Sequence, residues 1–190
     1  MRICAHCETD FKPQRSTGVY CSPRCRVYAF REARANIPTD LVTVPRWVTF
    51  SRDKMPRQVD GSPASSTDPA TWATFAAASS AARVLDRGVG FVLNGDGIAC
   101  IDLDHCISDG VLGYAAADIV ARAGKTFIEV SPSGTGLHIW GFAEVGRGRR
   151  MGQVEVYDRG RYMTVTGNRW GSSPKRLGDI SALVADLVGE

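Results

Sequence analysis

The stretch Gly97-Ile98-Ala99-Cys100-Ile101-Asp102-Leu103-Asp104 decides the fold, because it is an apolar segment that ends in two carboxylates one residue apart. Residues i and i+2 of a β-strand project from the same face, so we expect Asp102 and Asp104 to lie side by side. Two like charges in an apolar strand are costly unless a cation lies between them. Mg²⁺ and Mn²⁺ take oxygen ligands of this kind, which makes the pair a candidate metal site. The alternative is a polar strand end beside a turn.

A glycine-rich turn follows downstream, in Ser133-Gly134-Thr135-Gly136-Leu137-His138. Gly134 and Gly136 allow backbone N–H groups to turn toward an anion, and the hydroxyls of Ser133 and Thr135 add donors. His138 comes next on a predicted strand, where its ring can reach a phosphate. The pattern indicates a phosphate-binding turn, and the alternative is a hairpin turn with a half-buried histidine.

A third acidic position lies in Gln153-Val154-Glu155-Val156-Tyr157, where Glu155 interrupts an apolar strand. Asp158 competes with Glu155 for a third metal-ligand position, and the apolar flanks favour Glu155. Arginines bracket this segment. A charge run is usually a solvated face, but here it surrounds a candidate metal site, so two of the arginines are candidate phosphate ligands: Arg159 and Arg161.

Composition is that of a soluble globular chain, with 190 residues of which 44% are hydrophobic and 23% charged. It has no run of about 18 apolar residues, as a membrane span requires, and Met1-Arg2-Ile3-Cys4 does not open a signal peptide. We therefore expect a cytoplasmic protein with no membrane partner. Residues 1–34 carry seven basic residues, Arg15 among them, against three acidic ones, so their net charge is +4. The net charge of the whole chain is +3, so the remaining residues sum to −1. A basic appendage on a near-neutral body indicates a polyanionic partner.

The cysteines also set the N-terminal segment apart, since Cys4 and Cys7 are followed by Cys21 and Cys25. Four thiolates with C-x2-C and C-x3-C spacing can close a tetrahedral Zn²⁺ site, and so short a segment cannot otherwise bury a core. We predict a zinc-binding module in residues 1–35, with a short strand at residues 18–20 and a helix at residues 24–34. It resembles treble-clef and zinc-ribbon modules, which are common on nucleic-acid enzymes.

After a linker at residues 36–40, the pattern of residues 41–190 predicts one α+β domain with a mainly antiparallel sheet. Strands are expected at residues 45–50, 90–94, 97–103, 126–130 and 137–142, with a tight hairpin turn at residues 95–97. A second hairpin is expected from residues 154–157 and 162–165. Helices are expected at residues 68–85, 114–123 and 179–188, and residues 51–69 are expected to form a loop.

Together, these motifs resemble the primase–polymerase domains of mobile genetic elements, within the archaeo-eukaryotic primase superfamily. That family has an apolar strand ending in D-x-D, an S-x-H or G-x-H motif, and a third apolar strand with an acidic residue. Residues 101–104, 133–138 and 154–157 match these motifs in this order. The resemblance covers residues 45–167 and implies an RRM-like sheet with packed helices.

The resemblance implies template-directed nucleotidyl transfer, by a DNA primase or DNA polymerase, in replication of a phage, plasmid or other mobile element. Asp102, Asp104 and Glu155 would hold two Mg²⁺ or Mn²⁺ ions. His138, the turn at residues 133–136 and the arginines would bind the nucleoside triphosphate, and the zinc module would bind single-stranded or primed template DNA. A separately encoded replicative helicase is an expected partner.

Two other functions fit parts of this pattern. One is a non-catalytic DNA-binding adaptor or replication regulator built on a primase-like core. The intact Asp102, Asp104 and His138 argue against it. The other is phosphodiester cleavage at the same metal site, which the triphosphate-suited turn disfavours.

Overall fold

The computed structural model describes residues 1–4, 6–14, 18–51 and 53–189, and it divides into two compact units, Met1–Asn36 and Ile37–Glu190. Arg15, which was counted in the basic charge of residues 1–34, lies outside the described residues.

The N-terminal unit contains a two-stranded ribbon, β1 (Arg2–Ile3) with β2 (Asp10–Phe11), and the helix α1 (Pro23–Asn36). The predicted helix is confirmed, but the strand predicted at residues 18–20 is wrong. Instead of pairing in a ladder, this part of the chain accepts a hydrogen bond from the Arg2 guanidinium at the carbonyl of Gly18. The backbone N–H of Cys21 then points to the sulfur of Cys4.

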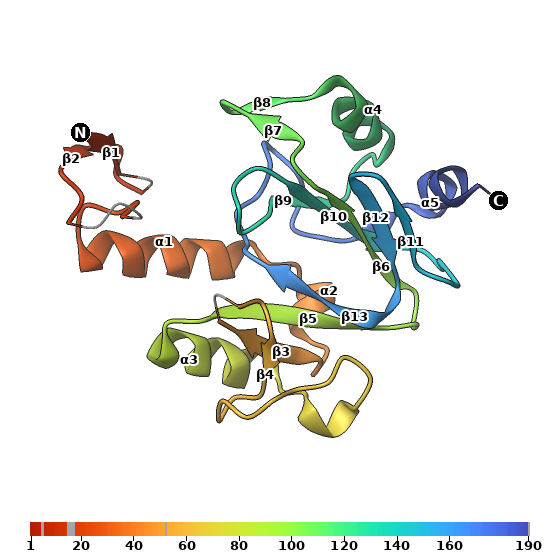
Figure 1. Ribbon diagram of the computed structural model, residues 1–190, viewed down its shortest axis with the longest axis horizontal. Helices are drawn as coiled ribbons and strands as arrows, with labels where there is room; N and C mark the ends of the chain where they lie inside the picture. The colour runs from red at the N-terminus through yellow and green to blue at the C-terminus, as the bar shows by residue number, and fades with distance from the viewer. Residues whose placement is uncertain (5, 15–17, 52, 190) are drawn as a thin grey trace. The chain divides into compact units, whose positions relative to one another are not determined.

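The larger unit is built on two separate sheets (Figure 1). Within the described residues, the first sheet has six strands in the order β11-β12-β6-β10-β14, and a further strand, β9, also pairs with β10. All pairings are antiparallel except that of β10 with β14. The strands are β6 (Ile98–Leu103), β9 (Phe127–Val130), β10 (Leu137–Phe142), β11 (Arg149–Met151), β12 (Val154–Tyr157) and β14 (Gly178–Asp179).

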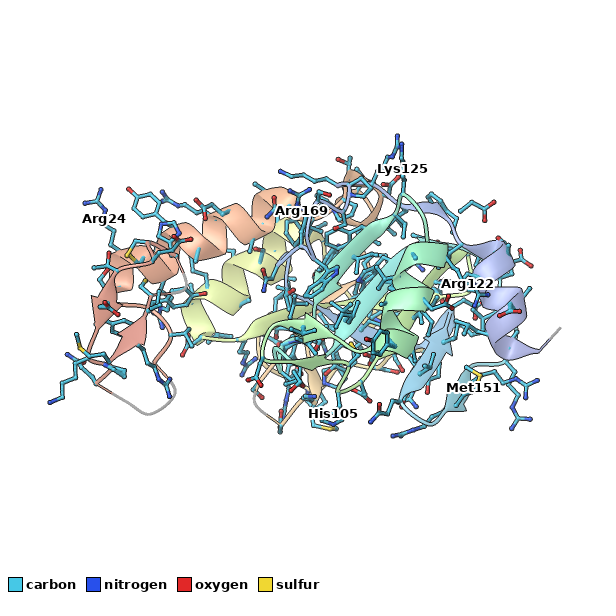
Figure 2. All side chains as sticks on the ribbon, turned by 90° about the horizontal axis from the view of Figure 1, so that it is seen from above. Arg24, His105, Arg122, Lys125, Met151 and Arg169 are labelled. Atoms are coloured by element: carbon cyan, nitrogen blue, oxygen red, sulfur yellow. The ribbon has the colours of Figure 1, made fainter. Side chains whose placement is uncertain are left out.

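One face of this sheet is covered by α4 (Tyr114–Arg122) and α5 (Ser181–Val188). Residues of the sheet and of both helices form one buried apolar cluster that includes Ile101, Ile119 and Leu183. Arg122 of α4 reaches the carboxylate of Asp186 in α5 at 2.6 Å, so an ion pair also joins the two helices (Figure 2).

The second sheet has four strands among the described residues, in the order β13-β5-β3-β4, and all its pairings are antiparallel. Figure 1 shows β5 and β13 side by side, with α3 beside β3 and β5. The elements of this layer are β3 (Trp47–Phe50), β4 (Pro56–Arg57), β5 (Gly88–Asn94), β13 (Arg159–Val165) and α3 (Phe75–Leu85). The short elements elsewhere in this unit are α2 (Thr39–Val42), the 3₁₀ helix Pro69–Thr71, β7 (Ile107–Ser108) and β8 (Val111–Leu112).

Aromatic side chains fill the space between the two sheets. Phe91 of β5 contacts Trp47 on its own sheet at 5.3 Å between ring centroids and Trp140 of β10 at 6.0 Å. Both tryptophans and Phe91 are fully buried. The α+β architecture with mainly antiparallel sheets is therefore as predicted.

Both predicted hairpins are wrong, for the same reason. β5 and β6 follow one another through a tight turn, and so do β12 and β13, but the members of each couple belong to different sheets. The backbone N–H of Gly95 donates to the carbonyl of Asp158 at 2.7 Å, so the two turns meet where the chain passes between sheets. Each of these four strands pairs with strands of its own sheet and not with its neighbour across the turn.

Three other predicted elements differ from the structure. The helix predicted at residues 68–85 is broken, because Trp72 is extended and Ala73 exchanges two backbone hydrogen bonds with Trp47. Asp68 caps only the 3₁₀ turn, and Thr74 caps α3. The predicted loop at residues 51–69 contains β4, which pairs with the end of β3, and the predicted linker runs into α2.

Among the described residues, no helix combines the length and apolar character needed to cross a membrane.

The parallel pairing of β10 with β14 predicts the effect of Gly141→Ala. A Cβ at this position would lie 2.7 Å from the carbonyl oxygen of Gly178 and from side-chain carbons of Ile180. We expect a loss of about 1–3 kcal/mol in the free energy of unfolding, measured by urea denaturation. Gly113→Ala, where the nearest neighbour is at 3.6 Å, is the control, and it should lose less, because only the N-cap of α4 is affected. An equal loss in both variants would contradict this account.

Candidate active site

The backbone register of the large sheet gathers the polar residues that the sequence analysis singled out. Asp102 of β6 pairs with Glu155 of β12 on one side and with His138 of β10 on the other, and His138 pairs with Glu129 of β9. Directly opposed residues of a sheet project from the same face. Glu155, Asp102, His138 and Glu129 therefore form one polar row across four neighbouring strands.

This polar row lies on the face that packs toward the second sheet. Two positions away along the same strands, another row consists of buried apolar side chains, namely Tyr157, Cys100, Trp140 and Phe127. The face on the other side of the sheet carries Ile101 and Ile139, which pack in the cluster with α4 and α5. The polar row thus begins where the apolar layer between the sheets ends.

Asp102 occupies the middle of the row. Its side chain is only 20% exposed, and this burial raises the pKa of Asp102. His138 and Lys54 lower the pKa, whereas the charges of Asp104 and Glu155 raise it, and the net shift is upward. A carboxylate held among other carboxylates in this way is stabilised by any cation that binds between them.

His138 lies between two acidic side chains. Its Nδ1 is 3.3 Å from Oε1 of Glu129, and its Nε2 is 3.7 Å from Oδ1 of Asp102. Burial lowers the pKa of His138, but the contact with Glu129 and the charges of Glu129 and Asp102 outweigh burial and raise it. The ring is only 4% exposed, and its neighbours include the backbone of Thr164, which also raises the pKa of His138, besides these two carboxylates.

The glycine-rich turn joins β9 to β10 and closes against the end of β6. A Cβ on Gly136 would lie 2.7 Å from the carbonyl oxygen of Leu103, so a side chain there would push the turn away from the strand that carries the two aspartates. Gly134 has a φ of +78°. The hydroxyl of Ser133 lies 3.0 Å from those of Ser131 and Thr135, which makes a row of exposed hydroxyls along the turn.

Glu155 is linked to two arginines. The Tyr157 hydroxyl donates to Oε2 of Glu155 at 2.9 Å and accepts from the Arg161 guanidinium at 3.1 Å, and that guanidinium also lies over the Tyr157 ring. Arg150 of β11 contacts Oε1 of Glu155 at 3.1 Å. Arg161 therefore reaches this end of the row through Tyr157, whereas Arg150, which is 69% exposed, contacts the carboxylate directly.

Asp158 has a different environment from Glu155. It is fully buried, accepts a hydrogen bond from the backbone N–H of Val145 at 3.0 Å, and makes two further contacts with the Arg159 guanidinium at 3.0 Å. Burial raises the pKa of Asp158, but Arg159 and Val145 outweigh it and hold the pKa below its usual range. The oxygens of Asp158 are thus paired with Arg159 and with the backbone N–H of Val145.

Asp102, Asp104 and Glu155 offer the oxygen ligands that a hard divalent cation prefers. Asp104 follows directly after β6, and its backbone N–H donates to the carbonyl of Gln153 at 2.8 Å, which continues the pairing of β6 toward the start of β12. In the part of the chain that the structure describes, Asp102, Asp104 and Glu155 do not bring their ligand atoms within 4.8 Å of one another. Their carboxylates have the chemistry that a cation prefers, and Asp102 and Glu155 are directly opposed in the register of the sheet.

The four cysteines do form a compact ligand set. The sulfurs of Cys4, Cys7, Cys21 and Cys25 all lie within 4.8 Å of one another. Cys21 lies 3.5 Å from both Cys7 and Cys25, close to the ~3.8 Å separation that tetrahedral Zn–S bonds produce. Burial raises the pKa of the Cys4 thiol, but backbone N–H groups of Cys7, Cys21 and His6 outweigh it and lower the pKa to about 6. The cluster fits a metal such as Zn²⁺.

The chain is similar to a phage protein. It is 32% identical, over 164 residues, to the DNA primase-polymerase of Nitratiruptor phage NrS-1. The match covers 76% of this chain and 22% of that relative, so the chain spans about a fifth of the length of the curated relative it matches. No protein-family model matches the sequence. The similarity supports a primase–polymerase domain in this chain.

Sequence reasoning missed two residues of this site. Glu129 lies in an apolar strand, Phe127-Ile128-Glu129-Val130, and the only signal for it was a carboxylate among apolar neighbours, the pattern that identified Glu155. Lys54 has a positive φ in a loop, and its charge acts on Asp102 from outside the large sheet. Loop geometry of that kind leaves no periodic pattern in the sequence.

The cysteine cluster predicts tight binding of about one Zn²⁺ per chain. Cys21→Ser should lower the Zn²⁺ affinity by more than about 100-fold, because one of four ligands is lost. A colorimetric metal-release assay measures both quantities. Cys106→Ser, which changes a thiol in the larger unit, is the control. Equal Zn²⁺ retention in Cys21→Ser and Cys106→Ser would contradict the assignment.

The environment of Asp158 predicts a pH-dependent role in stability. Because the folded-state pKa of Asp158 is lowered, its contribution is present above its unfolded-state pKa of about 3.9 and is lost as the pH falls through the folded-state value. Asp158→Asn should cost about 1–3 kcal/mol at pH 7, and the difference from the native chain should shrink below about pH 4. Urea denaturation at both pH values tests this, and a constant difference would contradict it.

Proposed function

We propose that the Ile37–Glu190 unit catalyses template-directed nucleotidyl transfer, as a DNA primase or DNA polymerase in replication of a phage or another mobile element. The observation that carries the proposal is the register that aligns Glu155, Asp102 and His138 on three neighbouring strands. The similarity to a phage primase-polymerase over most of the chain supports the same reaction class. We further propose that the two sheets form the RRM-like core of the archaeo-eukaryotic primases.

Asp102, Asp104 and Glu155 would hold two Mg²⁺ or Mn²⁺ ions in this proposal. When bound, such ions activate a 3′-hydroxyl and stabilise the charge that develops on the leaving pyrophosphate. The low exposure of Asp102 favours this role, because carboxylates and cations attract each other more strongly where water is excluded. Asp158 is not needed, since its oxygens already serve Val145 and Arg159.

The nucleoside triphosphate would lie between the polar row and the glycine-rich turn. The exposed hydroxyls of Ser133 and Thr135, with the backbone of Gly134 and Gly136, supply neutral donors, and His138 supplies a ring nitrogen on the side of Asp102. Arg161 can provide positive charge, because the group to which its guanidinium donates is the neutral Tyr157 hydroxyl. Arg159 can do so only by sharing its guanidinium with Asp158.

The N-terminal unit would bind single-stranded or primed template DNA. Its helix α1 carries exposed arginines, of which Arg24 lies over the Tyr28 ring at 5.4 Å (Figure 2 labels Arg24). Basic groups of this kind bind phosphates without reading sequence. A separately encoded replicative helicase stays a prediction.

The second candidate function is a non-catalytic DNA-binding adaptor on the same fold. The part-buried Asp102, facing two further carboxylates, argues against it, because this arrangement is costly for a protein that binds no cation there. Phosphodiester cleavage at the same site is the third candidate. A nucleotide-incorporation assay on primed and unprimed templates, with the template integrity followed in parallel, separates the three.

Asp102→Asn tests the catalytic proposal directly. We expect the incorporation of labelled nucleotides with Mn²⁺ to fall by more than about 100-fold, because the central carboxylate of the row is lost while the shape of the side chain is kept. The free energy of unfolding without added metal should be unchanged or higher, since repulsion from Asp104 and Glu155 is relieved.

Asp109→Asn is the matched control, because Asp109 is exposed in the turn between β7 and β8 and asparagine tolerates its positive φ. It should incorporate nucleotides like the native chain. Near-normal incorporation by Asp102→Asn would exclude the metal-ion role of this strand.

A further inference from the structure

Glu129 is a completely buried carboxylate that the proposed reaction does not use. Its two oxygens divide their contacts between two parts of the molecule. Oε2 accepts from the backbone N–H groups of Thr166 and Gly167 at 2.9 and 2.8 Å. The Thr166 hydroxyl lies 3.0 Å from Oε2 and 2.7 Å from the carbonyl of Val130. Oε1 accepts from the indole N–H of Trp140 at 3.1 Å and lies 3.3 Å from Nδ1 of His138.

A buried carboxylate is costly unless its oxygens are fully paired, and the five contacts of Glu129 meet that requirement. The three contacts at Oε2 have a structural purpose, because they tie the segment after β13 to β9. The amide oxygen of a glutamine could also accept from these three donors, although more weakly than a carboxylate oxygen. The contacts at Oε1 are different, because both partners there present ring nitrogens, and an amide NH₂ group cannot accept from them.

We infer that Glu129 is a positioning residue for His138. Its carboxylate accepts a hydrogen bond from the Nδ1–H group, which leaves Nε2 as the ring nitrogen on the side of Asp102. This inference rests on the proposed function, in which His138 contacts the nucleotide. Nδ1 and Nε2 lie on opposite sides of the imidazole, so holding Nδ1 toward Glu129 fixes the direction of Nε2. The 3.7 Å between Nε2 and Oδ1 of Asp102 places that atom next to the candidate metal site.

Glu129 also connects His138 to the second sheet. Thr166 and Gly167 follow directly after β13, which pairs along β5. One oxygen of the Glu129 carboxylate binds the backbone after β13, and the other contacts the His138 ring. Glu129 therefore holds these two parts at a fixed separation. A substitution of Glu129 should therefore change the orientation of the His138 ring toward the nucleotide, in addition to any loss of stability.

The first test is a long-range ¹H–¹⁵N NMR spectrum of the imidazole rings in the full chain, which has three histidines. His138→Asn assigns the His138 signals by their disappearance. We expect Nδ1 of His138 to carry a hydrogen-bonded proton in the native chain. A native spectrum in which Nδ1 carries no proton would overturn the inference, and this measurement needs neither a variant at Glu129 nor enzymatic activity.

The second test compares Glu129→Gln with Thr166→Val. In the glutamine variant the amide oxygen can take over the three donors at Oε2, which turns the NH₂ group toward His138 and makes Nδ1 an acceptor. Thr166→Val removes one donor at Oε2 and keeps the contact with His138. Both variants should lose stability, but only Glu129→Gln should lose the Nδ1 proton signal. An unchanged His138 signal in folded Glu129→Gln would contradict the inference.

The third readout is the kinetics of nucleotide incorporation. Glu129→Gln should raise the KM for the nucleotide about tenfold or more, whereas Thr166→Val should stay within about twofold of the native chain. Equal effects of the two variants would assign Glu129 a purely structural role. If the native chain incorporates no nucleotide, the proposed function fails, and the NMR spectra still decide whether Glu129 holds His138.

Discussion

The antiparallel register of β6 with its two neighbours is the constraint on which the rest of the site depends. Asp102 stands opposite Glu155 on one side and opposite His138 on the other, and His138 stands opposite Glu129. Because side chains alternate between the faces of a strand, a slip of one residue would move a polar side chain onto the face that packs against α4 and α5. That face is wholly apolar around Ile101 and Ile139, so the slip is strongly disfavoured.

The same register explains how charged groups are tolerated beside a hydrophobic core. The polar row lies next to the buried row that contains Cys100 and Trp140, so apolar side chains close one side of it. At one end of the row, Arg150 contacts Glu155. At the other end, backbone N–H groups after β13 donate hydrogen bonds to Glu129. Asp102, in the middle, faces His138 on one side and further carboxylates on the other, which makes it the position where a cation gains the most.

From the sequence, most helices and strands could be predicted, but which strands pair with one another could not. Runs of apolar residues predicted β6, β10 and β12, and the motifs in these runs identified Asp102, His138 and Glu155 as candidate site residues. The turn Gly95-Asp96-Gly97 has the composition of a hairpin turn, yet β5 and β6 enter different sheets. Pairing energy is summed over whole strands, and the turn contains no information on which distant strand offers the longer ladder.

Local patterns also failed where a tertiary contact replaced a local one. Residues 68–85 have helical composition, but the backbone of Ala73 pairs with Trp47 and ends the first turn. Glu129 was not distinguished from an ordinary surface residue, because its role depends on donors from Trp140, Thr166 and Gly167 that only the fold brings together. Its burial explains why a carboxylate is present in that strand.

The most direct measurement of the central claim is anomalous diffraction from crystals of the chain soaked with Mn²⁺ and a non-hydrolysable nucleotide. The account predicts Mn²⁺ within about 2.5 Å of carboxylate oxygens of Asp102, Asp104 and Glu155, with the phosphates on the side of His138. Anomalous density at Asp158 instead, or a nucleotide bound with no Mn²⁺ at Asp102, would contradict it.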